Sequence, residues 1–346
     1  MAAVPLTSFH EVRRFCYGNV FSVSARQMRG ASDSPLRLTG AVIAGIIISS
    51  LTSRLGLSLN DHHPLYGVLL ILLSGLLLAS HDGLAKHLSE FYPVFLVIWA
   101  RYVAQTLLMT ALFVPRMGQR VFRTLRPWPQ LLRGLSLVGV SLLFINGLHY
   151  IPLAEATAVI FLTPLLVTVA SALLGERVSR SQWIAVVLGL VGVLIIVRPG
   201  SALFTPAVLL PFGAALSFTV YQLVTRRLAG TDHPVTSNYL TSLVGCVTMS
   251  VLVVFNWRTP TLHDGLLMAT LGGMAMLGHL LLTNAFRFAS AATLAPFTYG
   301  QIVFAGIVGY VAFDHAPDAG ALLGMAVIIA SGLFMAYVQR RQSGPG

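Results

Sequence analysis

The sequence predicts an all-α integral membrane protein with ten transmembrane helices, arranged as two inverted repeats of five helices. Three observations carry this prediction: the composition, the length of the apolar segments and the placement of the arginines between them. Of the 346 residues, 56% are hydrophobic and only 10% are charged, too few charged side chains to cover a soluble globule of this size. The net charge of +11 comes from arginines between apolar segments, which argues against a nucleic-acid-binding protein.

Residues 1–63 differ from the remainder, and we expect an N-terminal cytoplasmic extension that is disordered or interfacial. They carry more arginines than acids, and their one apolar run, residues 41–51, is about half the length of a membrane span. This run also fits the core of a signal peptide, or sequence upstream of a start at Met28. A cleaved signal would place the next segment outside the cell, against the charge distribution.

Ten apolar segments follow, and each has roughly the 20 residues that cross the hydrocarbon core of a bilayer. Short connections make neighbouring helices antiparallel. The segments lie at about residues 66–86, 94–115, 130–149, 154–175, 182–198, 204–226, 236–256, 264–286, 292–313 and 318–338.

Arginines are concentrated in alternate connections between these segments. By the positive-inside rule, both termini are expected in the cytoplasm and the protein in the bacterial cytoplasmic (inner) membrane. The opposite side holds only Lys86, Arg198 and Arg258. The arginine-rich connections hold Arg116, Arg120, Arg123, Arg126, Arg177, Arg180, Arg226, Arg227, Arg287, Arg340 and Arg341.

A shift of 138 positions relates the two halves of the chain, placing Asn146 on Asn284 and Glu176 on Asp314. Few residues are identical, but segment lengths and connections agree, which predicts one repeat over residues 64–200 and another over 201–341. Because each repeat has an odd number of spans, the second enters the membrane upside down relative to the first. Inverted repeats of this kind suit alternating access.

Two predicted helices of the first repeat carry ionisable side chains at a depth where such groups usually face a cavity or a partner. Asp82 and Lys86 are four residues apart on one helical face, as are Arg101 and Gln105 on the next helix. We expect Lys86 and Arg101 to contact the substrate and Asp82 to orient one of them. The alternative is a structural ion pair between Asp82 and Arg101.

Further candidates for substrate binding are polar or aromatic and come from both repeats. Asn146 and Asn284 occupy equivalent positions, which indicates a shared role; interhelical hydrogen bonding is the alternative. Protonation of His279 offers a means of coupling, although a buried histidine is more often bonded to a neighbour. The remaining candidates are Tyr150, Tyr221, Gln222, Tyr299 and Gln301.

Gating or structural roles are expected for Pro164, Glu176 and Pro296. Prolines within spans free backbone carbonyls that line a cavity, or else only kink the helix. Glu176 is expected to hold Arg177 or a helix end. Stripes of small residues are expected to pack helices together, namely Ala185, Gly189 and Gly192, and Gly320 and Gly324.

No catalytic constellation, phosphate-binding loop or metal-ligand spacing stands out, and Cys16 and Cys246 are far apart. We therefore expect neither enzymatic activity nor a cofactor. The expected partners are a small-molecule solute, a proton or sodium ion as coupling ion, the lipid bilayer and, in a homodimer, a second copy, but no nucleic acid.

From about residue 66 to 341, the chain resembles the EamA-type members of the drug/metabolite transporter superfamily. The resemblance implies a fold of ten helices in two repeats, and solute transport. The first repeat has a charged hinge, Gly175-Glu176-Arg177, with the Gly-Glu that is typical of the family. The equivalent second hinge, Phe313-Asp314-His315, departs from this pattern, so it is not given the role of the first. The resemblance is carried by Ala85-Lys86, Arg101-Tyr102, Tyr150 to Ala158, Pro164, Leu174-Gly175-Glu176-Arg177, Gly189 and Gly192 with Arg198-Pro199-Gly200, Tyr221 with Arg226, and Ala295-Pro296-Phe297-Thr298-Tyr299.

Together, these features predict a secondary transporter that moves a small organic metabolite across the inner membrane by alternating access. An amino acid, a vitamin, a nucleoside-type cofactor and a drug-like solute all fit. One alternative is a membrane-embedded enzyme acting on a lipid-linked substrate, for which Asp82 with His81, His149 and Glu155 is the candidate cluster. Another is a non-transporting membrane subunit.

Overall fold

The computed structural model describes residues 64–176, 178–197, 205–228, 231–288, 294 and 297–342. The predictions for residues 1–63 and for Pro296 lie outside these residues. The described chain is helical: α3 (Pro64–Phe91), α4 (Val94–Met117), η2 (Gly118–Phe122), α5 (Pro127–Gly147), α6 (Leu153–Ile160), α7 (Thr163–Leu173), α8 (Arg180–Val197), η3 (Pro206–Val208), α9 (Leu209–Leu228), α10 (Pro234–Val253), η4 (Val254–Asn256), α11 (Leu262–Phe288), α13 (Gly300–Phe313) and α14 (Ala319–Gln342).

The lengths of these helices match those of membrane spans. Within the described ranges, nine helical segments are long and apolar enough to cross a bilayer, and Gly300–Phe313 is a shorter apolar helix in the place of the ninth predicted span. The prediction of an all-α, multi-pass membrane protein is confirmed.

The fourth predicted span, expected as one helix, is broken between α6 and α7. Pro164 lies in the first turn of α7, and a proline has no N–H for the carbonyl of the residue four positions before it. That carbonyl belongs to Ile160, and it accepts a hydrogen bond of 2.6 Å from the Thr163 hydroxyl instead. The break therefore leaves the Ile160 carbonyl satisfied within the chain.

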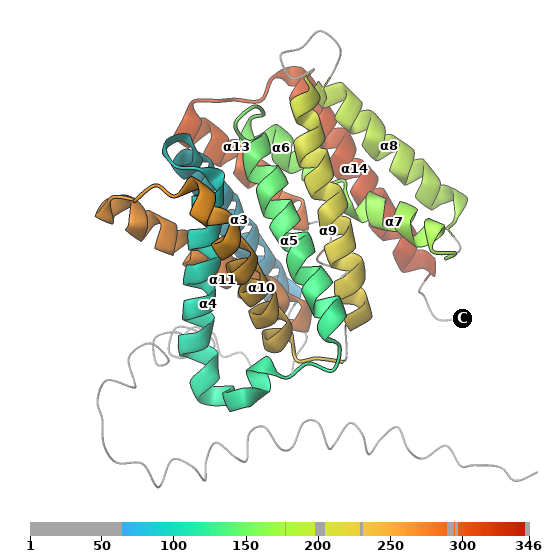
Figure 1. The fold of residues 1–346 in the computed structure, drawn as a ribbon. Helices are drawn as coiled ribbons and strands as arrows, with labels where there is room; N and C mark the ends of the chain where they lie inside the picture. The colour runs from blue at the N-terminus through green and yellow to red at the C-terminus, as the bar shows by residue number, and fades with distance from the viewer. Residues whose placement is uncertain are drawn as a thin grey trace, which may run out of the picture. The chain divides into compact units, whose positions relative to one another are not determined.

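Helices pair across the two repeats in a reciprocal way (Figure 1). α3 packs on α11, while α9, the repeat counterpart of α3, packs on α5, the counterpart of α11. Two helix pairs consist of counterparts that pack on each other, α4 with α10 and α8 with α14. A two-fold relation between the repeats produces this pattern, and the prediction of two inverted repeats is confirmed.

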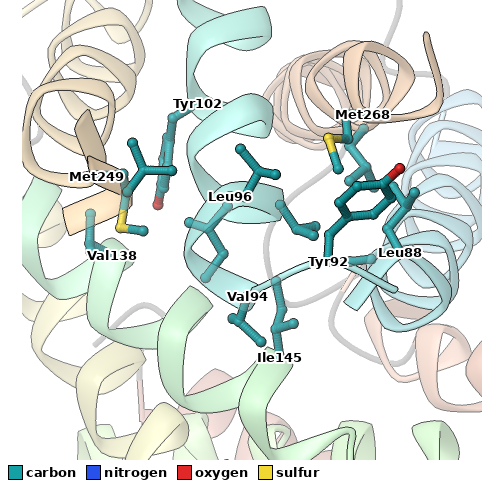
Figure 2. Packing of buried hydrophobic residues seen from close by; sticks show 14 residues of the cluster. Leu88, Tyr92, Val94, Leu96, Tyr102, Val138, Ile145, Met249 and Met268 are labelled. Carbon is teal, nitrogen blue, oxygen red and sulfur yellow. The ribbon is translucent and has the colours of Figure 1, made fainter. Parts of the chain in front are cut away.

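One apolar cluster joins five helices at the end of the bundle where α3 ends and α4 begins. Figure 2 shows how its side chains interdigitate between Tyr92, which directly follows α3, Leu96 of α4 and Met268 of α11. The Tyr92 hydroxyl donates a 2.6 Å hydrogen bond to Oδ2 of Asp264, so the ring's polar end is also satisfied. Large rings and aliphatic chains therefore fill the space between these five helices.

The contact between α8 and α14 depends on glycine. A Cβ atom built on Gly192 would lie 2.9 Å from the Gly324 carbonyl oxygen, and one on Gly324 would lie 2.6 Å from the Gly192 carbonyl oxygen. Since neither carbonyl belongs to a movable side chain, the two backbones approach this closely only without side chains. The predicted packing role of Gly192 and Gly324 is confirmed.

Candidate functional site

Arg101 is a buried cation in the middle of α4. Its Nη1 donates a 3.0 Å hydrogen bond to Ser141 of α5, and its guanidinium lies 4.8 Å from the ring centre of Tyr102. One turn further along α4, Gln105 is also buried. Arg101 Nε and Gln105 Oε1 have no hydrogen-bond partner in the described part of the chain. A donor and an acceptor are thus left available side by side on one helix.

Asp82 pairs with its neighbour His81 rather than with Arg101. The His81 Nδ1 and Asp82 Oδ1 atoms are 2.9 Å apart, and His81 Nε2 is buried without a partner among the described residues. The charge of Arg101 acts on both His81 and His279. Buried polar side chains of α3, α4 and α11 therefore lie at one level of the bundle, and His81, Arg101, Gln105 and His279 form what we call the polar level. The ion pair between Asp82 and Arg101, considered as an alternative, is not present in the described helices.

Lys86 turns towards the second repeat. Its ammonium lies 4.7 Å from the ring centre of Phe313 at the end of α13, a distance at which cation and ring attract. The carboxylates of Glu90 and Glu155 also act on its charge. The contacts of Lys86 are therefore with Phe313 of α13 and with the charges of Glu90 and Glu155, rather than with the Asp82 side chain one turn before it.

Arg133 of α5 is held by a set of hydrogen bonds that sequence reasoning missed. It is buried, and all five of its N–H groups donate to neutral acceptors on α9 and α10. Its guanidinium also lies 4.7 Å from the Tyr221 ring centre. The signal available in the sequence was a basic residue inside a predicted span. The acceptors are the Thr225 hydroxyl (2.8 Å), the Ser237 carbonyl (2.7 Å), the Thr241 hydroxyl (2.9 Å), the Tyr221 hydroxyl (2.7 Å) and Asn238 Oδ1 (3.2 Å).

Asp232 fastens the connection before α10 to the connection before α5. Its carboxylate accepts hydrogen bonds from the Thr124 hydroxyl, the Leu125 N–H (3.2 Å) and the Gln130 amide (2.8 Å). Desolvation would raise the pKa of Asp232, but these hydrogen bonds and the nearby Arg126 charge together hold that pKa below its usual range. The ionised carboxylate therefore stabilises this contact.

Acid is expected to weaken the Asp232 contact. Because the pKa in the folded state lies below the unfolded value of about 3.9, the ionised group stabilises the fold above that value and ceases to do so as pH falls through the folded pKa. Melting temperatures of wild type and Asp232→Asn, measured from about pH 6 to about pH 3, should therefore converge towards acid. A difference that stays constant over this range would contradict the role of the charge.

Glu155, in the first turn of α6, is the most deeply buried acid of the described chain. One carboxylate oxygen lies 3.2 Å from Nε2 of His315, which follows α13, and the other has no partner among the described residues. His149 instead bonds the Ser89 carbonyl at 3.0 Å. The acid–histidine cluster required by a membrane enzyme is therefore divided among separate partners, and the described residues contain no group of three or more metal-binding side chains.

The other predicted residues are spread over the bundle. Asn146 and Asn284 each donate to the carbonyl four residues earlier, Leu142 (2.7 Å) and Leu280 (2.8 Å), so the two repeat positions share one local contact. Tyr299 is buried 5.4 Å from the Phe161 ring and against Gly332.

The remaining placements concern the surface, one helix contact and one ion pair. Tyr150 is exposed, whereas Gln222 is half-buried. Gln301 of α13 packs on Gly75 of α3. Exposed Glu176 lies 3.6 Å from Arg226 at the end of α9, a contact between the first hinge and the second repeat.

Comparison with known proteins points to one family. The model of the EamA-like transporter family matches residues 65–198 and 205–337. An S-adenosylmethionine uptake transporter of Rickettsia bellii is 28% identical over 286 residues, 82% of this chain and 98% of that protein. A riboflavin transporter of Vibrio cholerae is 28% identical over 291 residues, 82% of this chain and 96% of that protein. One solved crystal structure, 22% identical, shares the fold with a TM-score of 0.56 over 80% of this chain and 98% of that one.

Proposed function

Because the chain belongs to the EamA-like transporter family, we propose that it carries a small organic solute across the bacterial cytoplasmic membrane by alternating access. Both termini lie in the cytoplasm in this proposal, since the arginine-rich connections are on that side. An ion gradient, of protons or of sodium, drives the solute. One chain forms one transport path, and association into a homodimer leaves that path unchanged.

The observation that carries the proposal is a group of buried polar atoms without partners on neighbouring helices. In the described residues this group includes His81 Nε2, Arg101 Nε and Gln105 Oε1. An unpaired polar group inside a protein costs free energy, up to about 3 kcal/mol. Such atoms persist where a polar ligand bonds them during part of the working cycle. The polar level formed by α3, α4 and α11 is therefore the proposed binding site.

The solute class follows from the chemistry of this level and from the relatives. S-adenosylmethionine and riboflavin, named for two relatives, both join a planar nitrogen heterocycle to a hydroxylated five-carbon unit. Arg101 and Gln105 offer a donor and an acceptor for such a solute. Phe218 and Tyr221 of α9 form a stacked pair with ring centres 5.5 Å apart beside Arg133, and we propose this pair as the aromatic contact of the heterocycle. We propose a solute of this heterocyclic class. Asp82 of α3 and His279 of α11 belong to the same proposed lining. Lys86, Asn146, Gln222, Asn284 and Gln301 are proposed to line the transport path at other levels.

A thermal-shift screen of purified protein tests the site and the solute class together. A compound that binds only the folded protein, at about 100 times its Kd, adds about 2.7 kcal/mol of stability. We expect S-adenosylmethionine, riboflavin or a close analogue to raise the melting temperature by roughly 3–5 °C, and amino acids to have no effect. The ligand-induced rise should disappear in Arg101→Ala, because the solute loses its charged donor.

Arg116→Ala is the matched control, since Arg116 is an exposed arginine at the end of the same helix. It should keep the full ligand-induced rise. Equal rises in wild type and Arg101→Ala would reduce Arg101 to a structural role. A rise with amino acids only would overturn the heterocyclic class while leaving solute transport in place.

A further inference from the structure

Glu155 combines deep burial with an incomplete set of contacts. Its side chain is 2% exposed, and the side chain of its partner His315 is 41% exposed. The atom Oε2 of Glu155 is buried and has no partner among the described residues. Because an ionised carboxylate inside a protein is costly unless its oxygens are bonded, the unbonded oxygen leaves this carboxylate incompletely stabilised by the described residues.

The contact between Glu155 and His315 crosses from one repeat to the other. Glu155 begins α6 in the first repeat, and His315 lies in the connection between α13 and α14 in the second. Lys86 of α3 lies close enough to interact electrostatically with Glu155, and it also lies over Phe313, two residues before His315. Three segments at this end of the bundle therefore meet around one carboxylate.

The other charges near Glu155 are few. The remaining helices packed on α6 are α8, α9 and α14. Their described residues are charged only at the end remote from Glu155, at Arg180, Arg226, Arg227, Arg340 and Arg341. Arg198, which follows α8 at the near end, lies outside the described residues, and His149, in the connection before α6, bonds the Ser89 carbonyl. At the near end, α3 carries Lys86 and Glu90, with His81 and Asp82 one turn further in, and the connection after α13 carries Asp314, His315 and Asp318.

The donor set favours a proton over a sodium ion. A hard metal cation prefers several oxygen ligands, whereas Glu155 faces an imidazole nitrogen and the charge of an ammonium group. Histidine is the side chain that ordinarily changes charge between about pH 5 and 8. A half-exposed histidine on a buried carboxylate provides a short path for a proton between water and the protein interior.

We propose that Glu155 carries the coupling proton of the transport cycle and that His315 delivers it from the outer side; the proposal rests on the transport function proposed above. The Nε2–H bond of the His315 imidazolium breaks as the proton moves to Oε1 of Glu155 and forms an O–H bond. The imidazole becomes neutral and regains a proton from outer water. Glu155 then no longer carries a charge for Lys86 or His315, so the contact between the repeats loosens at the outer end.

Distance measurements on spin-labelled protein test this proposal without any solute. Labels are placed at Phe91 and Ala316, both exposed at the outer end, in a background of Cys16→Ser and Cys246→Ser. Between about pH 8 and about pH 5, where histidines titrate, we expect a longer distance to gain population in the otherwise wild-type protein. Glu155→Gln, which cannot ionise, should show the longer distance at both pH values. Glu90→Gln removes an exposed charge near the same lysine and should respond like wild type.

Transport in proteoliposomes supplies the second readout, with S-adenosylmethionine and riboflavin as probes. Glu155→Gln should keep exchange of a transported probe in the absence of a gradient and lose its stimulation by an inward proton gradient. His315→Gln keeps a hydrogen-bond donor but carries no exchangeable charge, and its half-exposed position makes it the safer variant for folding. It should slow gradient-driven uptake at least about tenfold.

The outcomes separate this proposal from the proposed function. If Glu155→Gln responds to pH and to the proton gradient as wild type does, the proton site is overturned while transport stands. If neither probe is transported by wild type but the label distance depends on pH through Glu155, the heterocyclic solute class is wrong and the proton site stands.

Discussion

Replacing Arg133 by lysine is expected to lower the melting temperature by roughly 3–5 °C, corresponding to a loss of about 3 kcal/mol. A lysine keeps the buried charge but has three donors for the five acceptors that surround Arg133. Thr225 and Thr241 also donate to carbonyls of their own helices, so they lose only an acceptor role. Most of the loss should come from the Tyr221 hydroxyl and Asn238, together with the poorer solvation of the buried cation.

The control for this prediction is Arg126→Lys, an exposed position just before α5. Surface substitutions of this kind usually change stability by no more than about 0.5 kcal/mol. Differential scanning fluorimetry of both variants in the same detergent measures the difference. If Arg133→Lys melts together with Arg126→Lys, the five hydrogen bonds do not stabilise the contact of α5 with α9 and α10.

Alanine at Gly324 is expected to destabilise the protein by about 1–3 kcal/mol, the usual cost of overpacking. Its Cβ would lie 2.6 Å from the Gly192 carbonyl oxygen and 2.5 Å from a side-chain carbon of Ile196. The Ile196 side chain can adjust, but a backbone carbonyl cannot, so α8 and α14 must separate. Gly192→Ala should have a similar effect for the same reason.

A glycine without neighbours supplies a control of opposite sign. A Cβ on Gly265 of α11 would meet nothing within 4 Å, and alanine stabilises a helix by up to about 1 kcal/mol relative to glycine. Gly265→Ala should therefore raise the melting temperature slightly. The double variant Gly192→Ala with Gly324→Ala should cost less than the sum of the two, because either substitution already parts the helices. Strict additivity would contradict a shared contact.

Much of the fold could be predicted because apolar length, proline and glycine positions can be read from each segment by itself. Apolar length located the helices, although α3 continues to Phe91, beyond the predicted end at residue 86. Pro164 was recognised as an interruption, and the structure shows a full break there between α6 and α7. The glycines of α8 and α14 were recognised as packing positions because only small side chains allow helices to approach closely in a membrane.

The contact partners of the polar residues in the candidate site could not be predicted in this way. Asp82 and Lys86 are correctly spaced to be helical neighbours, yet Asp82 bonds His81 and Lys86 lies over Phe313. Arg133 received no role, because its acceptors belong to helices far away in the sequence. Glu155 was noted as a polar residue, but its partner His315 was identified only through the contact between the repeats.

Segment length, arginine placement and proline position determined the membrane class, the repeat and the helix order, because each of these depends on how one segment interacts with lipid, water or its own backbone. The choice of partner for every buried charge was decided only by the tertiary structure. The donor–acceptor distance of a hydrogen bond can vary by only a few tenths of an ångström. For these buried charges, that distance and the bond angle depend on how helices from different repeats cross, and no local sequence pattern encodes the crossing.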